Sequence, residues 1–207
     1  WPTRPSRWPG TSEPVALDLA PPLRKAVPAD GRALAELVNF AGEGIPLWLW
    51  KRIAGPGEDP WAVGTARQAE RAEAGQIVVV DEGAGVMAAM TGYPIEAPEP
   101  ITDDIPPLIK ALQELENLVV GTWYLNVLAT YPRARGRGLG ARLIAHGEAI
   151  AREAGLGAVS IIVADENHGA RRLYERLGYR EIDSRDMVKE DWQSPSSQWI
   201  LLKKDLT

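Results

Sequence analysis

The chain has 207 residues, of which 45% are hydrophobic and 25% are charged, and its formal net charge is -5. These proportions fit one globular domain with at most a short appendage. The acidic balance disfavours broad binding to a phosphate backbone, so we expect no nucleic-acid partner. No stretch approaches the roughly 18 consecutive apolar residues that a bilayer span needs, so we expect no membrane partner either.

The sequence contains no cysteine and only two histidines, His146 and His168. Disulfides, thiolate metal sites and a cysteine nucleophile are therefore excluded, and two histidines are too few for a multi-histidine centre, so we expect no metal. Residues 1–22 are rich in Pro, Ser, Thr and Arg and lack the apolar segment of a signal peptide. We interpret them as an extended N-terminal arm on a cytoplasmic protein, followed by a single domain over 23–207.

The first part of that domain combines one strand, three helices and a hairpin. Residues 23–27 predict a strand, and apolar residues at helical spacing predict helices over 30–40, 47–53 and 65–74. Two β-branched or apolar runs, at 77–80 and 86–93, flank Asp81-Glu82-Gly83 and predict a β-hairpin.

Residues 94–118 interrupt the regular pattern. The segment carries five prolines among acidic residues, and leucines recur at helical spacing after Pro106-Pro107, a suitable helix start. We interpret 94–118 as a loop and a short amphipathic helix inserted between strands.

The remainder alternates strands and helices and then ends in two strands. Strands are predicted at 123–129, 158–164, 180–188 and 199–203, and helices at 138–154 and 167–177. Neighbouring strands followed by β-α-β units predict an α/β domain of mixed (α+β) type, with a central mixed β-sheet flanked by helices.

The segment Arg135-Gly136-Arg137-Gly138-Leu139-Gly140 joins a predicted strand to a helix. Alternating glycines allow backbone N–H groups to point into one concavity, and the helix N-terminus and the arginines add positive charge. This chemistry suits a pyrophosphate. The Gly-Lys-Ser/Thr end of a Walker loop is absent, and a dinucleotide fingerprint ending at Ala141 lacks an acid at the expected spacing. A tight turn with solvated arginines remains the alternative.

Two segments together resemble one family. Arg135-x-x-Gly138-x-Gly140 and the segment 167–179, Asn-His-Gly-Ala-Arg-Arg-Leu-Tyr-Glu-Arg-Leu-Gly-Tyr, resemble the two signatures of the GCN5-related N-acetyltransferase (GNAT) superfamily. The resemblance implies a sheet in which two central parallel strands splay apart to form an acyl-CoA cleft. It also implies an N-acetyltransferase that uses acetyl-CoA as co-substrate and transfers acetyl to a primary amine by direct attack in a ternary complex.

The resemblance also implies which residues bind the co-substrate. The pantetheine arm should be bound by backbone groups on the strand before the loop, at Val127, Leu128, Ala129 and Thr130. The pyrophosphate should be bound by amides of the loop, at Arg135, Gly136, Arg137, Gly138, Leu139 and Gly140. A further hydrogen bond to the co-substrate should come from Asn167.

Three residues are candidates for the chemistry. Tyr174, which the resemblance implies to lie near the thioester sulfur, is the predicted general acid, because a phenol stays protonated until a thiolate leaves. Packing of the helix against the sheet is its alternative role. Asn126 stands where many relatives have an acid and would position substrate or water. Glu116 is the base candidate, since the insert should overhang the acceptor cleft.

The acceptor and the partners are less determined by the sequence. A small-molecule amine is the expected acceptor, with a peptide or protein amine as alternative, and the acidic chain mildly favours a cationic one. The final strands offer a surface for a homodimer. A non-catalytic acyl-CoA-binding or sensor domain is the rival interpretation, and a nicotinamide-dependent oxidoreductase is a distant third.

Overall fold

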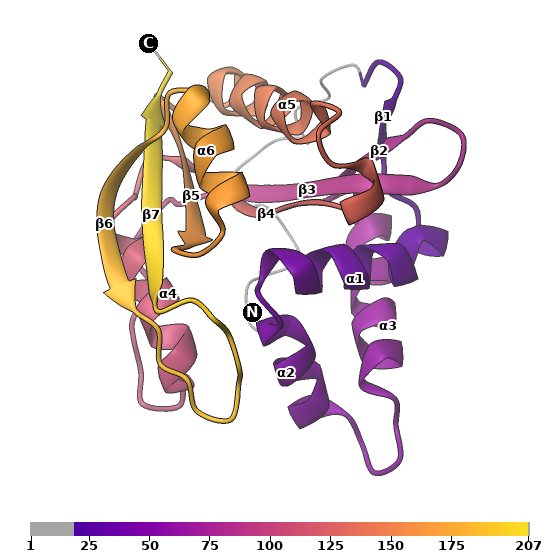
Figure 1. The fold of residues 1–207 in the computed structure, drawn as a ribbon, viewed down its shortest axis with the longest axis vertical. Coiled ribbons are helices and arrows are strands. Elements are labelled where there is room, and N and C mark those ends of the chain that lie inside the picture. Colours follow the sequence, from indigo (N-terminus) through magenta and orange to yellow (C-terminus); the bar gives the residue numbers. More distant parts are fainter. Residues whose placement is uncertain (1–18, 207) are drawn as a thin grey trace.

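The computed structural model describes residues 19–206, so most of the predicted N-terminal arm lies outside the described residues (Figure 1). Within the described part, a 7-stranded sheet has the order β1-β2-β3-β4-β5-β7-β6. The strands are β1 (Leu23–Lys25), β2 (Val78–Asp81), β3 (Val86–Pro94), β4 (Trp123–Thr130), β5 (Ala158–Ala164), β6 (Arg180–Asp186) and β7 (Gln198–Asp205). All adjacent pairs run antiparallel except β4 and β5, which run parallel. The predicted mixed sheet is confirmed.

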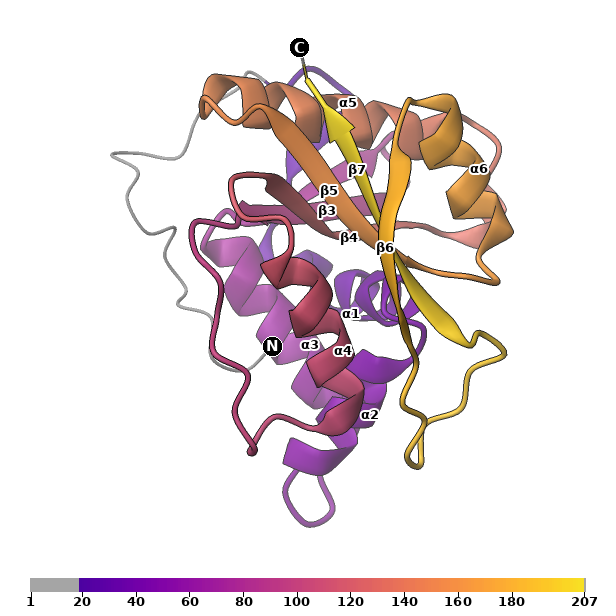
Figure 2. The ribbon, with the colours of Figure 1, turned by 90° about the vertical axis from the view of Figure 1, so that its left-hand side faces the viewer.

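Six α-helices of the described residues cover the two faces of this sheet (Figures 1 and 2). They are α1 (Gly31–Ala41), α2 (Ile45–Ile53), α3 (Pro60–Glu73), α4 (Pro107–Asn117), α5 (Leu139–Glu153) and α6 (His168–Arg176). Helices α5 and α6 pack on one face, and α1 to α4 pack on the other. The predicted order of strands and helices is reproduced throughout, and no helix among residues 19–206 is long and apolar enough to cross a membrane.

Helix α3 begins five residues before the predicted start at 65. Asp59 caps it, because the Asp59 side chain accepts a hydrogen bond from the Trp61 N–H at 3.0 Å, and Pro60 occupies the first turn, where no N–H donor is needed. The earlier start brings Trp61 against Trp50 of α2, with ring centroids 5.8 Å apart. This contact fixes α3 beside α2.

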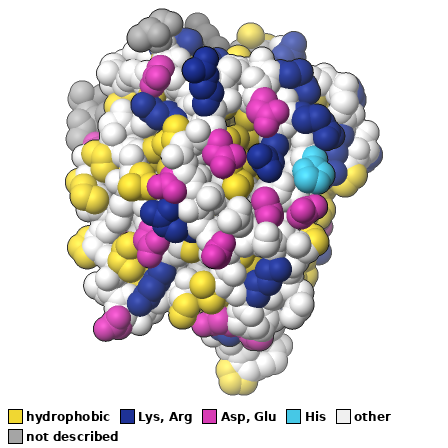
Figure 3. Space-filling view, turned by 60° about the vertical axis from the view of Figure 1, so that its left-hand side comes forward, with side chains coloured by type: hydrophobic (Ala, Val, Ile, Leu, Met, Phe, Trp, Pro, Cys, Tyr) yellow, Lys and Arg dark blue, Asp and Glu magenta, His cyan; other side chains and the backbone are white. Residues whose placement is uncertain are grey.

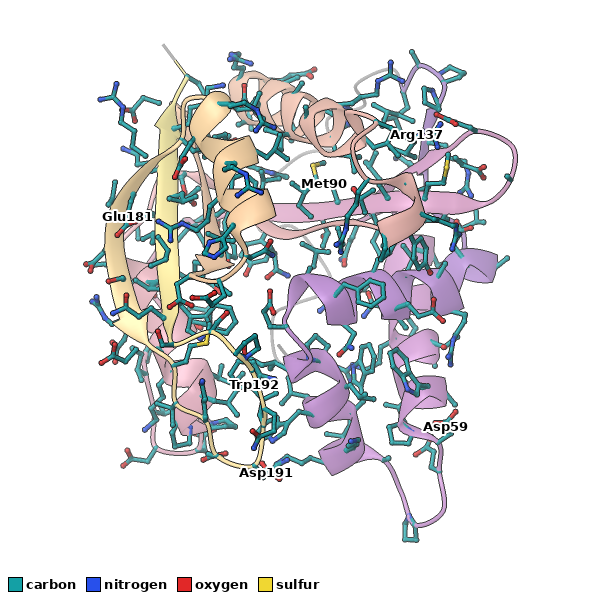
Figure 4. All side chains as sticks on the ribbon, in the orientation of Figure 1. Asp59, Met90, Arg137, Glu181, Asp191 and Trp192 are labelled. Atoms are coloured by element: carbon teal, nitrogen blue, oxygen red, sulfur yellow. The ribbon has the colours of Figure 1, made fainter. Side chains whose placement is uncertain are left out.

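Helix α5 approaches the sheet closely at Gly147. A Cβ at this position would lie 3.0 Å from Leu125 Cδ2 on β4 and 3.1 Å from Met90 Sδ on β3. Figure 4 shows Met90 extending from β3 toward α5. Glycine thus allows the helix to lie directly on the central strands, which places the N-terminus of α5 beside the carboxyl end of β4.

The inserted segment forms the predicted loop and helix. Helix α4 buries Leu108, Leu112 and Leu115 against β5 and β7, and the Glu114 carboxylate pairs with Arg185 of β6 at 2.9 Å. Figure 3 shows acidic and basic side chains intermixed over much of the face that it draws. Strand β6 forms one edge of the sheet. The homodimer predicted through the final strands stays a prediction.

Candidate active site

The central feature of the sheet is the separation of its two parallel strands. Strands β4 and β5 pair only at Trp123–Val159, Tyr124–Ser160 and Leu125–Ile161. Beyond that point each strand continues, but a cavity of about 730 Å³ lies between them. On this side β4 has no neighbouring strand to satisfy its backbone donors and acceptors, which are therefore free to bind an extended ligand. The predicted splaying of the parallel strands is confirmed.

The glycine-rich loop forms one end of this cavity. Gly136 and Gly138 have φ angles of +75° and +76°, a region in which side-chain-bearing residues are strained, and an added Cβ on either would meet no atom within 4 Å. Helix α5 begins at Leu139 with no side-chain cap. The first amides of an α-helix have no intrahelical acceptor, so this end offers N–H donors and partial positive charge to an anion.

Most residues predicted to bind the co-substrate line the same cavity. Those that line it are Leu128, Ala129, Thr130, Arg135, Gly136, Gly138, Leu139, Gly140 and Asn167. Val127 instead lines a second cavity. The Arg137 side chain turns to the β2–β3 hairpin, where it contacts Glu82 and Met87 (Figure 4). Only the backbone of Arg137 is left to serve the predicted role.

Three further arginines differ in their placement. Arg172 and Arg176 of α6 line the large cavity together with Arg135, which matches the charge of a polyanionic ligand. Arg171 lies elsewhere, because it donates to the Asp165 carbonyl and pairs with Glu181 at 3.5 Å. Of the neighbouring pair Arg171 and Arg172, only Arg172 lines the large cavity, where its charge suits a phosphate.

Tyr174 lies on the wall of the large cavity and is only 4% exposed. Burial raises the pKa of its phenol well above the ordinary value, because the desolvated phenolate is disfavoured. Among residues 19–206 its hydroxyl makes no hydrogen bond, although its ring lies 6.0 Å from that of Tyr179. The hydroxyl is therefore a protonated donor that is available to a ligand.

The second cavity, of about 140 Å³, lies between the helices on the opposite face and the same central strands. Its wall includes residues of α1, α2, α3 and α4 together with Tyr124, Asn126 and Val127 of β4. Ala41, Asn126 and Ile162 line both cavities. The predicted positioning residue, Asn126, thus lies where the two cavities meet.

Glu116 is placed differently from its expected position over an acceptor cleft. Its side chain is 0% exposed, and its carboxylate accepts a hydrogen bond from the Tyr93 hydroxyl at 3.0 Å. Glu116 lines neither cavity, although Leu112 of the same helix lines the smaller one. Because the Glu116 carboxylate is buried and lines neither of these two cavities, we do not propose it as the base.

Glu43, which the sequence interpretation did not consider, lines the large cavity. It adopts φ +52°, and Gly44 follows at φ +90°, so the two residues make the sharp turn between α1 and α2. Burial raises the pKa of the Glu43 carboxyl above its ordinary value, whereas the hydrogen bond from Asn167 Nδ2, at 3.4 Å, acts in the opposite direction. A carboxylate with a raised pKa in a cavity has the properties of a general base.

The β6–β7 loop fixes the turn that carries Glu43. The Trp192 indole N–H donates to the Glu43 carbonyl at 2.9 Å, and its ring stacks on Trp199 with centroids 6.0 Å apart. Asp191 accepts hydrogen bonds from Trp48 and Arg52 of α2. Figure 4 shows Asp191 and Trp192 on this loop beside α2. These contacts hold an uncommon backbone conformation in place, as expected at a functional position.

The two histidines lie away from the cavities. Burial lowers the pKa of His146 on α5, and His168 lies 3.4 Å from Glu166 at the start of α6. Neither histidine lines a cavity. Across residues 19–206, no three or more acidic or histidine side chains gather in a way that could hold a metal ion.

We predict that Gly138→Glu weakens the binding of acetyl-CoA, the co-substrate that the sequence resemblance implies, by roughly 100-fold or more, because it places bulk, strain and negative charge where a phosphate would lie. Gly155→Glu is the matched control, since Gly155 has φ +71° and open space around it at the other end of α5. Isothermal titration calorimetry measures both variants. Equal affinity of Gly138→Glu and the wild type would contradict the assignment of this loop.

The structure is thus an α/β protein with a mixed sheet whose parallel strands separate over a glycine-rich loop, and the resulting cavity has a shape and charge that suit a phosphate-bearing ligand. The family model described as the acetyltransferase (GNAT) family matches residues 47–179. The chain therefore belongs to the acetyltransferase (GNAT) family. No curated protein matches the chain in sequence.

Solved structures have the same fold at low sequence identity. One, described as the crystal structure of acetyltransferase, is 21% identical with TM-score 0.64 and covers 89% of this chain and 99% of that chain. Mosquito arylalkylamine N-acetyltransferase like 5b is 20% identical with TM-score 0.62 and the same coverages. Ribosomal-protein-alanine N-acetyltransferase from Brucella melitensis is 19% identical with TM-score 0.58, again with those coverages. At these identities the likeness establishes the fold.

Proposed function

We propose that the protein transfers the acetyl group of acetyl-CoA to a primary amine by direct attack in a ternary complex. The meeting of the two cavities at Ala41, Asn126 and Ile162 carries this proposal. A donor between the splayed strands and an acceptor between the helices could be bound together, with their reactive groups adjacent. Such proximity is what a direct transfer requires.

The large cavity fits the chemistry of acetyl-CoA. The loop amides and the arginines at positions 135, 172 and 176 suit the phosphates, while the unpaired edge of β4 suits the amide groups of a pantetheine arm. Tyr174 and Glu43 line the cavity near the separation of the strands. Acetyl-CoA would supply an activated thioester, and the residues of the chain would supply position and proton transfer.

Glu43 and Tyr174 have complementary roles in this proposal. The Glu43 carboxylate takes a proton from the attacking ammonium or amine, and Asn126 orients the nitrogen. The amine nitrogen forms a bond to the acetyl carbon as the carbon–sulfur bond breaks, and the Tyr174 hydroxyl gives its proton to the leaving thiolate. Burial keeps the Tyr174 phenol neutral and raises the pKa of the Glu43 carboxyl.

The test is CoA release from acetyl-CoA in the presence of a panel of small amines and peptides with free N-termini. Amine-dependent release supports transfer. Tight binding of acetyl-CoA without release on any amine would favour the rival function, a non-catalytic acyl-CoA-binding or sensor domain.

The small amine is the expected acceptor because the second cavity is lined largely by apolar side chains within the fold.

A further inference from the structure

The smaller cavity contains two arginines that have no counter-ion within the part of the chain that the structure describes. Arg67 and Arg71 lie one turn apart on α3, and both line this cavity. Among residues 19–206 neither forms an ion pair. Burial lowers the pKa of Arg71, and the neighbouring Arg67 charge lowers it further. Two like charges one helical turn apart destabilise a protein unless an anion lies between them.

Gln68, which lies on the same helix between the two arginines in sequence, is the second unusual group. Its side chain is 4% exposed and lines the cavity, yet its Oε1 has no hydrogen-bond partner among the described residues. An unsatisfied buried acceptor is costly, and only an N–H or O–H donor can satisfy it. Because Gln68 Oε1 is itself buried, it does not reach into the cavity, and it is the two arginines that call for an anion.

The rest of the cavity wall is mainly apolar. Its large apolar side chains include Ile45, Leu49, Trp50, Ile53, Leu112 and Trp199. No Asp or Glu of the described chain lines this cavity, so its wall offers no carboxylate to a second positive charge on an acceptor. This composition departs from the cationic acceptor expected from the net charge of the whole chain.

We propose that the acceptor is a small amine that also bears a carboxylate, of the class of free amino acids with an apolar side chain. Arg67 and Arg71 bind the carboxylate, the apolar wall holds the side chain, and the amine lies toward Asn126, where the two cavities meet. This inference rests on the proposed acetyl transfer, since it names the acceptor of that reaction. Bidentate binding of a carboxylate is the interaction for which arginine is best suited.

The experiment compares L-phenylalanine and L-leucine with their carboxamides and with the corresponding decarboxylated amines, using the full chain. We expect kcat/KM to favour the carboxylates by roughly 10- to 100-fold. Arg71→Gln should remove that preference by raising KM for the amino acid, with the KM for acetyl-CoA unchanged. Arg180→Gln removes the same charge from an exposed position outside both cavities and should retain the preference.

Gln68→Glu separates a binding role from a structural one. It places a carboxylate of the chain beside the two arginines, so we expect an unchanged or raised melting temperature together with a higher KM for the amino acids. Equal kcat/KM for amino acids and decarboxylated amines, unaffected by Arg71→Gln, would overturn the inference and leave acetyl transfer standing. Preferred acetylation of peptides with amidated C-termini would overturn it as well.

Product binding provides a measurement that does not depend on turnover. N-acetyl-L-phenylalanine should bind the protein in the presence of CoA, and its carboxamide should bind roughly tenfold or more weakly in calorimetry. Binding that requires Arg71, in a protein that acetylates no amine, would support the carboxylate site while contradicting the proposed transfer. Equal binding of the acid and the amide would overturn the carboxylate site.

Discussion

Glu43→Gln is expected to lower kcat by roughly 100-fold or more, with little change in acetyl-CoA affinity, because the substitution removes the carboxylate that we propose as the acceptor of the amine proton and retains the shape of the side chain. Stopped-flow or steady-state measurement of CoA release tests this directly. Glu70→Gln is the matched control, since Glu70 is an exposed carboxylate on α3 that lines neither cavity. Similar rates for Glu43→Gln and the wild type would remove Glu43 from the mechanism.

The raised pKa of Glu43 gives this prediction a pH signature. A carboxyl with a raised pKa becomes protonated at a higher pH than an ordinary glutamic acid, so the base form is lost as pH falls through that raised value. The wild type should lose activity on the acid side with an apparent pKa above that of a free Glu side chain, and Glu43→Gln should lack that limb. Measuring the pH profile with two amines of different basicity separates the two causes of the acid-side loss of activity. A loss caused by Glu43 occurs at the same pH with both amines, whereas a loss caused by protonation of the amine shifts with the basicity of the amine.

The same shift predicts the effect on stability. Because the folded state holds the Glu43 proton more tightly than the unfolded state does, the ionised carboxylate destabilises the fold as pH rises above the unfolded value. Glu43→Gln removes this ionisation, so at neutral pH its melting temperature should equal or exceed that of the wild type. A large drop in melting temperature would mean that lost activity reflects misfolding.

Tyr174→Phe is expected to lower kcat by roughly 10- to 1,000-fold while the melting temperature changes little. The Tyr174 hydroxyl makes no hydrogen bond among the described residues, so removing it breaks no hydrogen bond there and deletes only the proposed proton donor. Since burial keeps the phenol protonated, its ionisation should impose no alkaline limb on the rate in the usual assay range.

Tyr179→Phe provides the contrasting control. The Tyr179 hydroxyl hydrogen-bonds Glu148 at 3.3 Å, and Tyr179 lines neither cavity. Its replacement should therefore lower stability by about 1 kcal/mol and leave kcat nearly unchanged. Equal kcat values for wild type and Tyr174→Phe would assign Tyr174 to packing alone, which is its alternative role.

The loop and the helix cap that line the large cavity could be predicted because their determinants are local in sequence. Glycines at 136 and 138 and the asparagine that opens α6 specify turn and cap conformations within a few residues. Strand and helix order likewise followed from periodicity. The early start of α3 was missed although Asp59-Pro60 carries a cap signal, because Gly64 interrupts the helical pattern there.

The lining of the smaller cavity could not be predicted because its determinants are distant in sequence. Arg67, Gln68 and Arg71 belong to a helix that appears solvent-facing in isolation, and they become cavity residues only when α2 and α3 pack beneath β4. Glu43 gains significance only through Asn167 and Trp192, which lie more than 100 residues further along the chain. The burial of Glu116 could have been anticipated, because it lies four residues after Leu112 on the apolar side of α4.

Acetyl-CoA labelled in its acetyl group tests the central claim most directly, with L-phenylalanine as acceptor and the label followed by mass spectrometry. We predict that each CoA released corresponds to one labelled acetyl group on the amine nitrogen, and that the protein itself carries no label at any time. Recovery of the label as free acetate, or as an acetylated protein intermediate, would contradict direct transfer to an amine.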